Sequence, residues 1–177
     1  MRFYYFVILL FVFTGELFAQ EKEVIMEKTG NNSSVWEKDT LPLSPDEKER
    51  YKEFTITLSR FDVETTVNRI KQNLKEMEIP VFALFDHGKN AREVDLDLRP
   101  TQVIVFGSPR VGTLLMQENQ LISLELPLKI AVWEDAEGKI WVGFLQIKNR
   151  VRNYGLEQSP IIDKMQLLLE DIVKKSV

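Results

Sequence analysis

The residues best suited to chemistry follow two apolar runs of the chain, and the first of them is a histidine. His87 comes directly after the apolar run 81–85 and stands between Asp86 and Gly88. An imidazole titrates near neutral pH, so it can serve as a general base, a metal ligand or an anion-binding group. It can equally hold a loop through hydrogen bonds to the backbone. Because ligand crevices form where strands of α/β sheets end, His87 is the first candidate site residue.

The second group lies in the segment VIVFGSPRVGTLLM, residues 103–116. Gly107 permits a close backbone approach, and Ser108 followed by Pro109 is typical of a helix start. Free amides there, together with Arg110, would suit a carboxylate or phosphate. Gly112 costs about 1 kcal/mol inside a helix, which indicates tight packing or a bound group. The segment is therefore either a candidate anion site or a well-capped structural turn.

Two further acidic residues, Asp95 and Asp97, alternate with the apolar residues of the segment 94–98. On a strand, both carboxylates would point to the same side as Arg99. Such a pair could bind Ca²⁺ or act as a general acid, but a solvated strand face is the simpler interpretation. The candidate ligand-binding residues are therefore His87, Gly107, Ser108, Arg110 and Gly112, and His87 is also the candidate catalytic residue.

Several kinds of chemistry are excluded by composition and by missing motifs. The chain of 177 residues has one histidine and no cysteine, so the common zinc sites and a cysteine nucleophile cannot be built from it. It contains no Walker phosphate loop, no dinucleotide-binding G-x-G-x-x-G and no G-x-S-x-G elbow. We expect no metal and no cofactor, and whether the chain is an enzyme stays open.

The charge balance argues against nucleic acid as a partner. The chain has 27 acidic and 23 basic residues, a net charge of −4, so it carries no basic field to attract phosphates. Without cysteine there is also no disulfide framework, and the fold must depend on its hydrophobic core.

The N-terminal residues predict export. Arg2 precedes an unbroken apolar run, 3–13, and the small residue Ala19 follows it, as in a cleavable signal peptide. The run is short for a membrane span, which needs about 20 apolar residues, although an uncleaved anchor is the alternative. We expect a signal peptide at 1–19, a polar flexible linker at 20–50 and a folded domain at 51–177. The mature protein would be periplasmic or secreted and would have no membrane contact.

Periodicity predicts the elements of the domain. Alternation indicates a half-buried strand at 53–59, and apolar spacings of three and four indicate a helix over 63–77, capped by Asp62 and ended by Pro80. The run 81–85 is apolar on both faces and predicts a central strand. Further along, we expect a strand at 101–107 and a helix from Ser108.

The last part of the chain predicts a hairpin and a long helix. Strands at 128–135 and 139–147 flank a short loop containing Gly138, with Trp133 and Trp141 facing each other across it. A short helix closed by Gly155 and a long helix from Pro160 follow. The order β-α-β-(α)-β-α-β-β-α indicates an α+β fold of two layers, a mixed β-sheet with helices packed on one face.

Several short motifs in order resemble a known family. They are Asp86-His87, Leu98-Arg99-Pro100-Thr101, Phe106-Gly107-Ser108-Pro109, Gly112-Thr113-Leu114-Leu115-Met116-Gln117, Leu126-Pro127-Leu128-Lys129 and Val132-Trp133-Glu134-Asp135. Over residues 53–157 the chain resembles the DUF302 family, a domain of unknown function. The family often has F-G-N-P where this chain has F-G-S-P. It often has R-H-G-L where this chain has Asn153-Tyr154-Gly155-Leu156, so a second histidine is missing here. The resemblance implies a compact α+β domain able to form a homodimer, and it implies no established reaction.

Three functions remain open. The first is an exported, non-enzymatic module that binds a small anionic ligand or a partner protein near His87 and the 107–112 loop. The second is a small hydrolase or isomerase with His87 as general base and the loop as oxyanion site. The third is a structural partner in an envelope assembly that uses the hairpin or the last helix as its interface. The first two require His87 and Arg110 to lie within reach of one small molecule.

Overall fold

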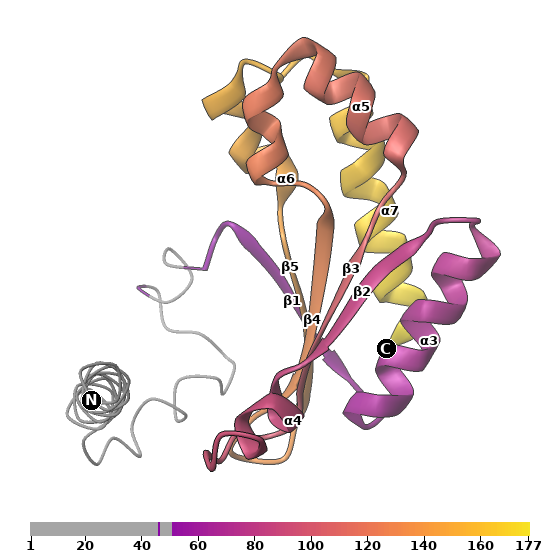
Figure 1. Ribbon diagram of the computed structural model, residues 1–177. Coiled ribbons are helices and arrows are strands. Elements are labelled where there is room, and N and C mark those ends of the chain that lie inside the picture. Colours follow the sequence, from indigo (N-terminus) through magenta and orange to yellow (C-terminus); the bar gives the residue numbers. More distant parts are fainter. Residues whose placement is uncertain (1–45, 47–50) are drawn as a thin grey trace, which may run out of the picture. The chain divides into compact units, whose positions relative to one another are not determined.

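A computed structural model describes residue 46 and residues 51–177, and these residues fall in one compact unit (Figure 1). Five strands form one sheet in the order β1-β5-β4-β3-β2. The strands are β1 (Phe54–Ser59), β2 (Val81–Asp86), β3 (Thr101–Phe106), β4 (Leu128–Glu134) and β5 (Ile140–Leu145). The segments predicted as a signal peptide (1–19) and, apart from residue 46, as a linker (20–50), with Trp36, lie outside the described residues.

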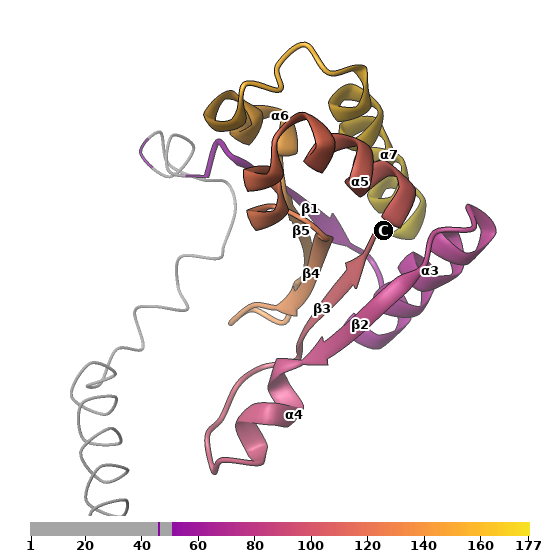
Figure 2. The ribbon, with the colours of Figure 1, turned by 45° about the horizontal axis from the view of Figure 1, so that its top comes forward.

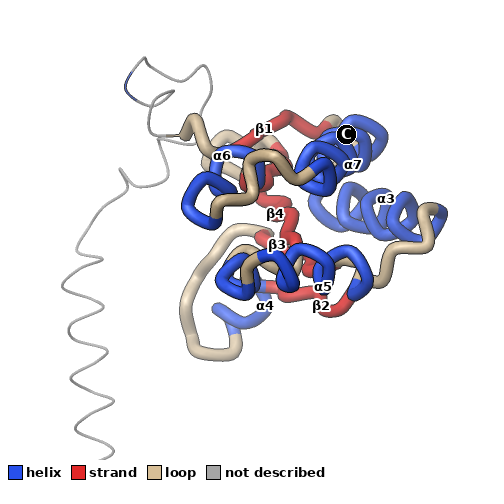
Figure 3. The backbone as a smooth tube through the Cα atoms, turned by 90° about the horizontal axis from the view of Figure 1, so that it is seen from above, coloured by secondary structure: helices blue, strands red, loops and turns tan. Residues whose placement is uncertain are grey.

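Two long helices cover one face of the sheet. They are α3 (Val63–Glu76) and α7 (Pro160–Ser176), which lie side by side (Figure 3). Arg69 Nε of α3 donates to the Ser176 carbonyl at 3.0 Å, and Asn73 Nδ2 donates to Ser176 Oγ at 2.8 Å. Alternate residues of β4 point toward these helices and are buried, namely Leu128, Ile130 and Val132.

The shorter helices lie beyond the ends of the strands. In Figures 1 and 2, α5 (Pro109–Glu118) and α6 (Ile147–Arg150) lie past one end of the sheet, and α4 (His87–Arg92) lies past the other. Two 3₁₀ segments, η2 (Gln120–Leu124) and η3 (Val151–Tyr154), accompany α5 and α6. The two ends of the sheet therefore carry different sets of side chains.

The predicted α+β class with two layers is confirmed, but the sheet is antiparallel throughout rather than mixed. Each neighbouring pair, β1–β5, β5–β4, β4–β3 and β3–β2, runs antiparallel. The reason lies in the connections. Because α4 and α5 stay at the strand ends, β2 to β5 simply reverse direction one after another. Among the connections between the described strands, only the one through α3 crosses the sheet, and it joins the two opposite edge strands, β1 and β2.

The predicted helix caps are confirmed. Asp62 Oδ1 accepts a hydrogen bond from the Thr65 amide at 2.7 Å, Glu64 lies in the first turn of α3 and Lys75 in its last. The 3₁₀ segment η3 ends at Gly155, whose φ of 67° is the left-handed conformation that glycine adopts easily. Pro160 opens α7 as its first residue.

Two expectations about strands are wrong. The run 81–85 does not form a central strand, because β2 is an edge of the sheet. The alternating segment 94–98 forms no strand at all. Asp95 has a φ of 58°, which a strand cannot accommodate, and Val94 and Leu96 are exposed. Asp95 and Asp97 therefore do not lie on the solvated strand face that the alternation predicts.

The predicted hairpin of β4 and β5 is confirmed, and it places Trp133 directly opposite Trp141. Its turn is organised by Asp135, which is 1% exposed. Oδ1 of Asp135 accepts from the Glu137 and Lys139 amides at 2.8 and 2.9 Å, and Trp141 Nε1 donates to Oδ2 at 2.7 Å. Burial would raise the pKa of Asp135, but these donors outweigh it and hold the pKa below its ordinary value.

Candidate functional site

The segment 107–112 is a capped turn from β3 into α5, as the sequence predicts. The Gly107 amide donates to the Pro80 carbonyl at 3.2 Å, so one of the amides expected to be free has a partner. Ser108 Oγ accepts from the Val111 amide at 3.5 Å, and Pro109 is the first helical residue. Ser108 is therefore the N-cap residue of α5, and its capping hydrogen bond is long.

A cavity of about 530 Å³ opens beside this turn. Its walls come from the start of β2, the end of β3, residues 109–116 of α5, η2, the segment before β4, and α7. The residues that line it are Ile79, Phe82, Phe106, Gly107, Ser108, Pro109, Val111, Gly112, Thr113, Met116, Ser123, Leu126, Pro127, Leu128, Met165 and Leu168. A volume of 300–1,000 Å³ is typical of small-molecule sites.

The chemistry of this cavity is apolar. None of the described residues that line it carries a charge, and its polar side chains are the hydroxyl groups of Ser108, Thr113 and Ser123. Met116 of α5 and Met165 of α7 contribute flexible thioether side chains that can adapt to different shapes. The cavity therefore suits an apolar molecule with a small hydrogen-bonding end.

Gly112 keeps part of the cavity open. A Cβ at this position would lie 3.6 Å from Leu126 Cδ1 and 3.9 Å from Met116 Cε, both on lining residues. An alanine would fit in ordinary contact, but a longer side chain has to extend among these residues. The helix-interior glycine that the sequence singles out is thus a lining residue of the cavity.

Arg110 does not take the role predicted for it. Its side chain is exposed at the start of α5 and is not among the residues that line the cavity. Gly107, Ser108 and Gly112 line the cavity while Arg110 does not, because adjacent positions of a helix face different directions. The cavity therefore lacks the guanidinium that an anion site here would need.

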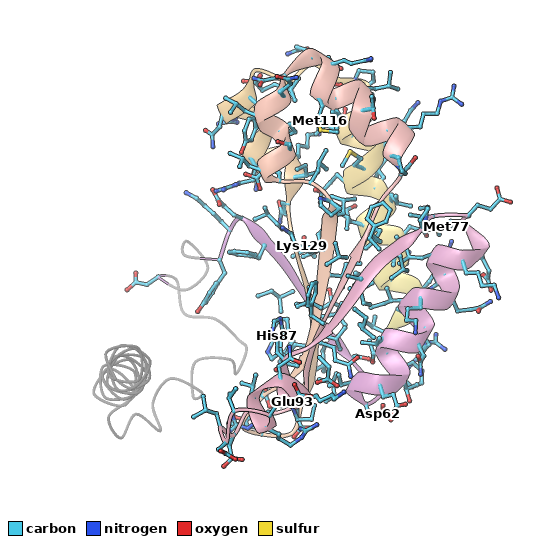
Figure 4. All side chains as sticks on the ribbon, in the orientation of Figure 1. Asp62, Met77, His87, Glu93, Met116 and Lys129 are labelled. Atoms are coloured by element: carbon cyan, nitrogen blue, oxygen red, sulfur yellow. The ribbon has the colours of Figure 1, made fainter. Side chains whose placement is uncertain are left out.

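His87 lies at the other end of the sheet. It is the first residue of α4, its side chain is exposed, and its ring stacks on Phe85 with the centroids 6.3 Å apart. Figure 4 shows His87 beside α4 and Met116 beside α5, at opposite ends of the strands. The structure therefore does not bring His87 and the 107–112 loop together at one site.

Asp86, beside His87, has a structural role. Its Oδ1 accepts from the Lys89 amide at 2.8 Å and so caps α4, and Gln102 Nε2 donates to Oδ2 at 3.4 Å. Within the described part of the chain, His, Asp and Glu side chains form no group of three or more that could hold a metal ion.

A polar cluster that the sequence did not predict surrounds Glu125. Tyr154 Oη donates to Glu125 Oε1 at 2.8 Å, and Arg150 Nε donates to the same oxygen at 3.2 Å. Arg150 also pairs with Glu53 at 3.2 Å. The hydrogen bond to Glu125 raises the pKa of the Tyr154 phenol. The cluster fastens η3 to the segment before β4, at the end of the sheet away from His87.

The fold and the cavity together define a class: a domain with one antiparallel sheet, helices on one face and an apolar cavity at one end. The chain belongs to the family described as "Domain of unknown function DUF302", whose model matches residues 54–174. The match includes most of α7, so the C-terminal helix is part of the family domain.

One solved structure has the same fold. It is described as the crystal structure of an uncharacterized conserved protein DUF302 from Bacillus stearothermophilus, with a TM-score of 0.62 and 19% sequence identity. The similarity covers 71% of this chain and 98% of that one.

Curated relatives include two proteins named "Fluoride-specific ion channel FluC 1", from Brucella suis and Brucella abortus. Each is 44% identical to this chain over 84 residues, which is 48% of this chain. The chain covers 33% and 31% of these two relatives, so it spans about a third of their length. In residues 46 and 51–177, the structure has no helix of sufficient length and apolar character to cross a bilayer.

Proposed function

We propose that the domain binds a small apolar molecule in the cavity between α5, α7 and the adjoining strand ends. The observation that carries the proposal is the lining, where aliphatic, aromatic and thioether groups surround about 530 Å³ and three hydroxyl groups supply the polar contacts. Burial of apolar surface contributes about 25 cal/mol per Å², so a ligand of this kind needs no charged anchor. A non-enzymatic binding module is the function that this lining supports best.

The proposal changes the ligand class expected from the sequence. A small anion would have to leave water for a cavity without a counter-charge, and burying an unpaired charge is costly. A neutral alkyl or ring compound has no charge to remove from water when it enters the cavity. We therefore favour a neutral ligand, or one whose charged end stays at the mouth of the cavity in water.

The hydrolase or isomerase hypothesis has less support, because His87 and the loop lie at opposite ends of the sheet. Export to the periplasm or to the medium stays part of the proposed function, carried by the residue pattern of 1–19. A ligand-binding domain outside the cytoplasm would meet lipids and other amphiphiles, which fit this chemistry.

A thermal-shift experiment on the full chain tests the proposal, with 1-decanol, decanoate and inorganic phosphate as probes. A ligand present at 100 times its Kd stabilises a protein by about 2.7 kcal/mol. We expect 1-decanol to raise the melting temperature and phosphate to leave it unchanged. A shift with phosphate and none with the alkyl probes would overturn the proposal in favour of an anion site.

Two variants on the same helix provide the matched comparison. Gly112→Leu places a long side chain among lining residues and should abolish the shift with 1-decanol. Arg110→Leu introduces the same residue two positions away, outside the lining, and should preserve it. Loss of the shift in Arg110→Leu alone would mean that the guanidinium, not the cavity, holds the ligand.

A further inference from the structure

The cavity beside α5 changes in character from its floor to its mouth. Phe106, Met165 and Leu128 are 0%, 6% and 8% exposed, so these apolar side chains form the floor. Pro109 and Thr113 line the same cavity but are exposed to solvent, so they belong to its mouth. A ligand that fills the cavity therefore has one end among apolar side chains and the other end in water beside α5.

The hydroxyl groups of the lining are concentrated at the mouth. Thr113 of α5 and Ser123 of η2 are both exposed. The third hydroxyl, that of Ser108, is half-buried, and its oxygen already accepts the capping hydrogen bond from the Val111 amide. A polar group placed at the floor would exchange its water partners for side chains that cannot form hydrogen bonds, which is costly. The lining therefore favours a ligand with its apolar tail inward and its polar head at the mouth.

Arg110 lies immediately outside this mouth. It directly follows Pro109 and precedes Thr113 by three positions, and residues three apart on a helix are neighbours, with about 5–6 Å between their Cβ atoms. Its side chain is exposed and, within the described part of the chain, makes no hydrogen bond or ion pair. An arginine can lay its stem along apolar surface and keep its guanidinium in water. A cation is therefore available beside Thr113, although none lies inside the cavity.

The other charged residues near the cavity are less well placed. Four lining residues are exposed and form the mouth, and among their direct neighbours in the sequence Arg110 alone carries a charge. These four are Phe82, Pro109, Thr113 and Ser123. The acidic residue Glu78 is next to Ile79, which is half-buried and belongs to the inner wall. Glu125 is next to Leu126, but its carboxylate already pairs with Arg150.

We propose that the cavity takes single-tailed amphiphiles with a carboxylate head, and that Arg110 and Thr113 bind this head at the mouth. The inference rests on the proposed function, because the tail must occupy the cavity. The planar guanidinium can donate to both oxygens of a carboxylate, and the Thr113 hydroxyl can donate to one of them. The ligand class is thereby narrowed from apolar molecules in general to compounds of the fatty-acid kind.

The tail and the head have separate tasks in this arrangement. Burial of the alkyl chain supplies most of the affinity, because an ion pair exposed to water contributes little. Phosphate has no tail, so Arg110 alone should not hold it. The guanidinium instead discriminates between ligands that share a tail and differ in the charge of the head.

Three probes with the same ten-carbon tail test this discrimination, namely decanoate, 1-decanol and decylamine. Their affinities for the full chain are measured by titration calorimetry. Arg110→Leu should weaken the binding of decanoate about two- to fivefold, which is the worth of an exposed ion pair. It should leave 1-decanol unchanged and strengthen the binding of decylamine, because a like charge is removed from the mouth. Arg110→Lys keeps the charge and should retain most of the affinity for decanoate.

A distant arginine provides the matched control. Arg92 is exposed on α4, at the opposite end of the sheet, and does not line the cavity. Arg92→Leu should leave all three affinities unchanged. Salt gives an independent check, because raising the ionic strength from about 0.05 M to about 1 M shortens the Debye length to about 3 Å. At the higher salt concentration, wild type and Arg110→Leu should bind decanoate equally well.

The outcomes separate this inference from the proposed function. If 1-decanol binds and Gly112→Leu abolishes its binding, the cavity is the ligand site. Equal effects of Arg110→Leu on decanoate and 1-decanol, or no effect on either, would then overturn the role of Arg110 alone. Weaker binding of decylamine in Arg110→Leu would overturn it as well. If none of the three probes binds the wild-type protein, the inference and the proposed function both fail.

Discussion

His87 and Gly107 lie at opposite ends of the antiparallel strand pair β2–β3. Asp86 pairs with Gln102 at one end, and Val81 pairs with Phe106 at the other. Five strand steps separate the two ends, or about 17 Å at 3.4 Å per residue. A residue at one end cannot touch a small molecule held at the other.

His87→Ala should therefore leave the binding of 1-decanol unchanged. The imidazole is exposed and stacks on Phe85, outside the lining of the cavity. Titration calorimetry with both proteins measures this directly. A large loss of affinity in His87→Ala, with the fold intact by circular dichroism, would show that the ligand lies near α4 instead.

Gly143 should tolerate no side chain as long as Trp133 is present. A Cβ on Gly143 would lie 2.9 Å from Trp133 Cζ3 and 3.0 Å from Cη2, closer than atoms can pack. Gly143→Ala must therefore displace the indole ring, and overpacking of this kind costs about 1–3 kcal/mol. Urea unfolding measures the cost. In a Trp133→Leu background the same change should cost clearly less, and an equal cost in both backgrounds would contradict the contact.

Asp135 should make the protein sensitive to acid. Its folded-state pKa is lowered from the ordinary value of 3.8, so its contribution is fully present above pH 4 and is lost as the pH falls through the folded value. Asp135→Asn replaces one acceptor oxygen by an NH₂ donor that faces the indole N–H or the turn amides. This change should lower the free energy of unfolding by about 2 kcal/mol near neutral pH. The free energy of unfolding should therefore fall less steeply with acid in Asp135→Asn than in the wild type. Parallel pH curves for the two proteins would refute this role.

Secretion should remove the N-terminal apolar segment. When the full chain is expressed in a bacterial host with an export pathway, mass spectrometry of the extracytoplasmic protein should show a first residue near Gln20, because Ala19 is the small residue that follows the apolar run. An intact Met1 in that fraction would refute cleavage.

Local patterns predicted most of the elements. The spacing of Val63, Val67 and Ile70 predicts α3, and Asp62, Ser108 and Gly155 stand at the predicted caps because capping depends on residues within one turn. The same local chemistry places Trp133 opposite Trp141, since a short hairpin loop fixes the register of its strands.

Local sequence patterns could not predict which strands lie next to one another in the sheet. Alternation shows which side chains of β2 share a face, but it does not show how many strands flank it. An apolar run therefore predicted a central strand where the structure has an edge.

The cavity was also beyond prediction. Phe82, Met116 and Met165 have the types and spacings of core residues, and whether such residues close on one another depends on contacts between distant elements. Gly112 was the one local signal, because a glycine inside a helix implies something close to its Cα. The separation of His87 from Arg110 likewise follows from strand pairing and not from distance along the chain.

The cavity itself is tested most directly by nuclear magnetic resonance of methyl-labelled methionine. The chain has five methionines, of which Met116 and Met165 line the cavity, while Met77 packs against the core outside the lining. On titration with 1-decanol, the methyl resonances of Met116 and Met165 should shift and saturate together while that of Met77 stays in place. In Gly112→Leu the same titration should produce no saturable shift. Unshifted Met116 and Met165 resonances in the wild type, at concentrations where decanol raises the melting temperature, would contradict binding in this cavity.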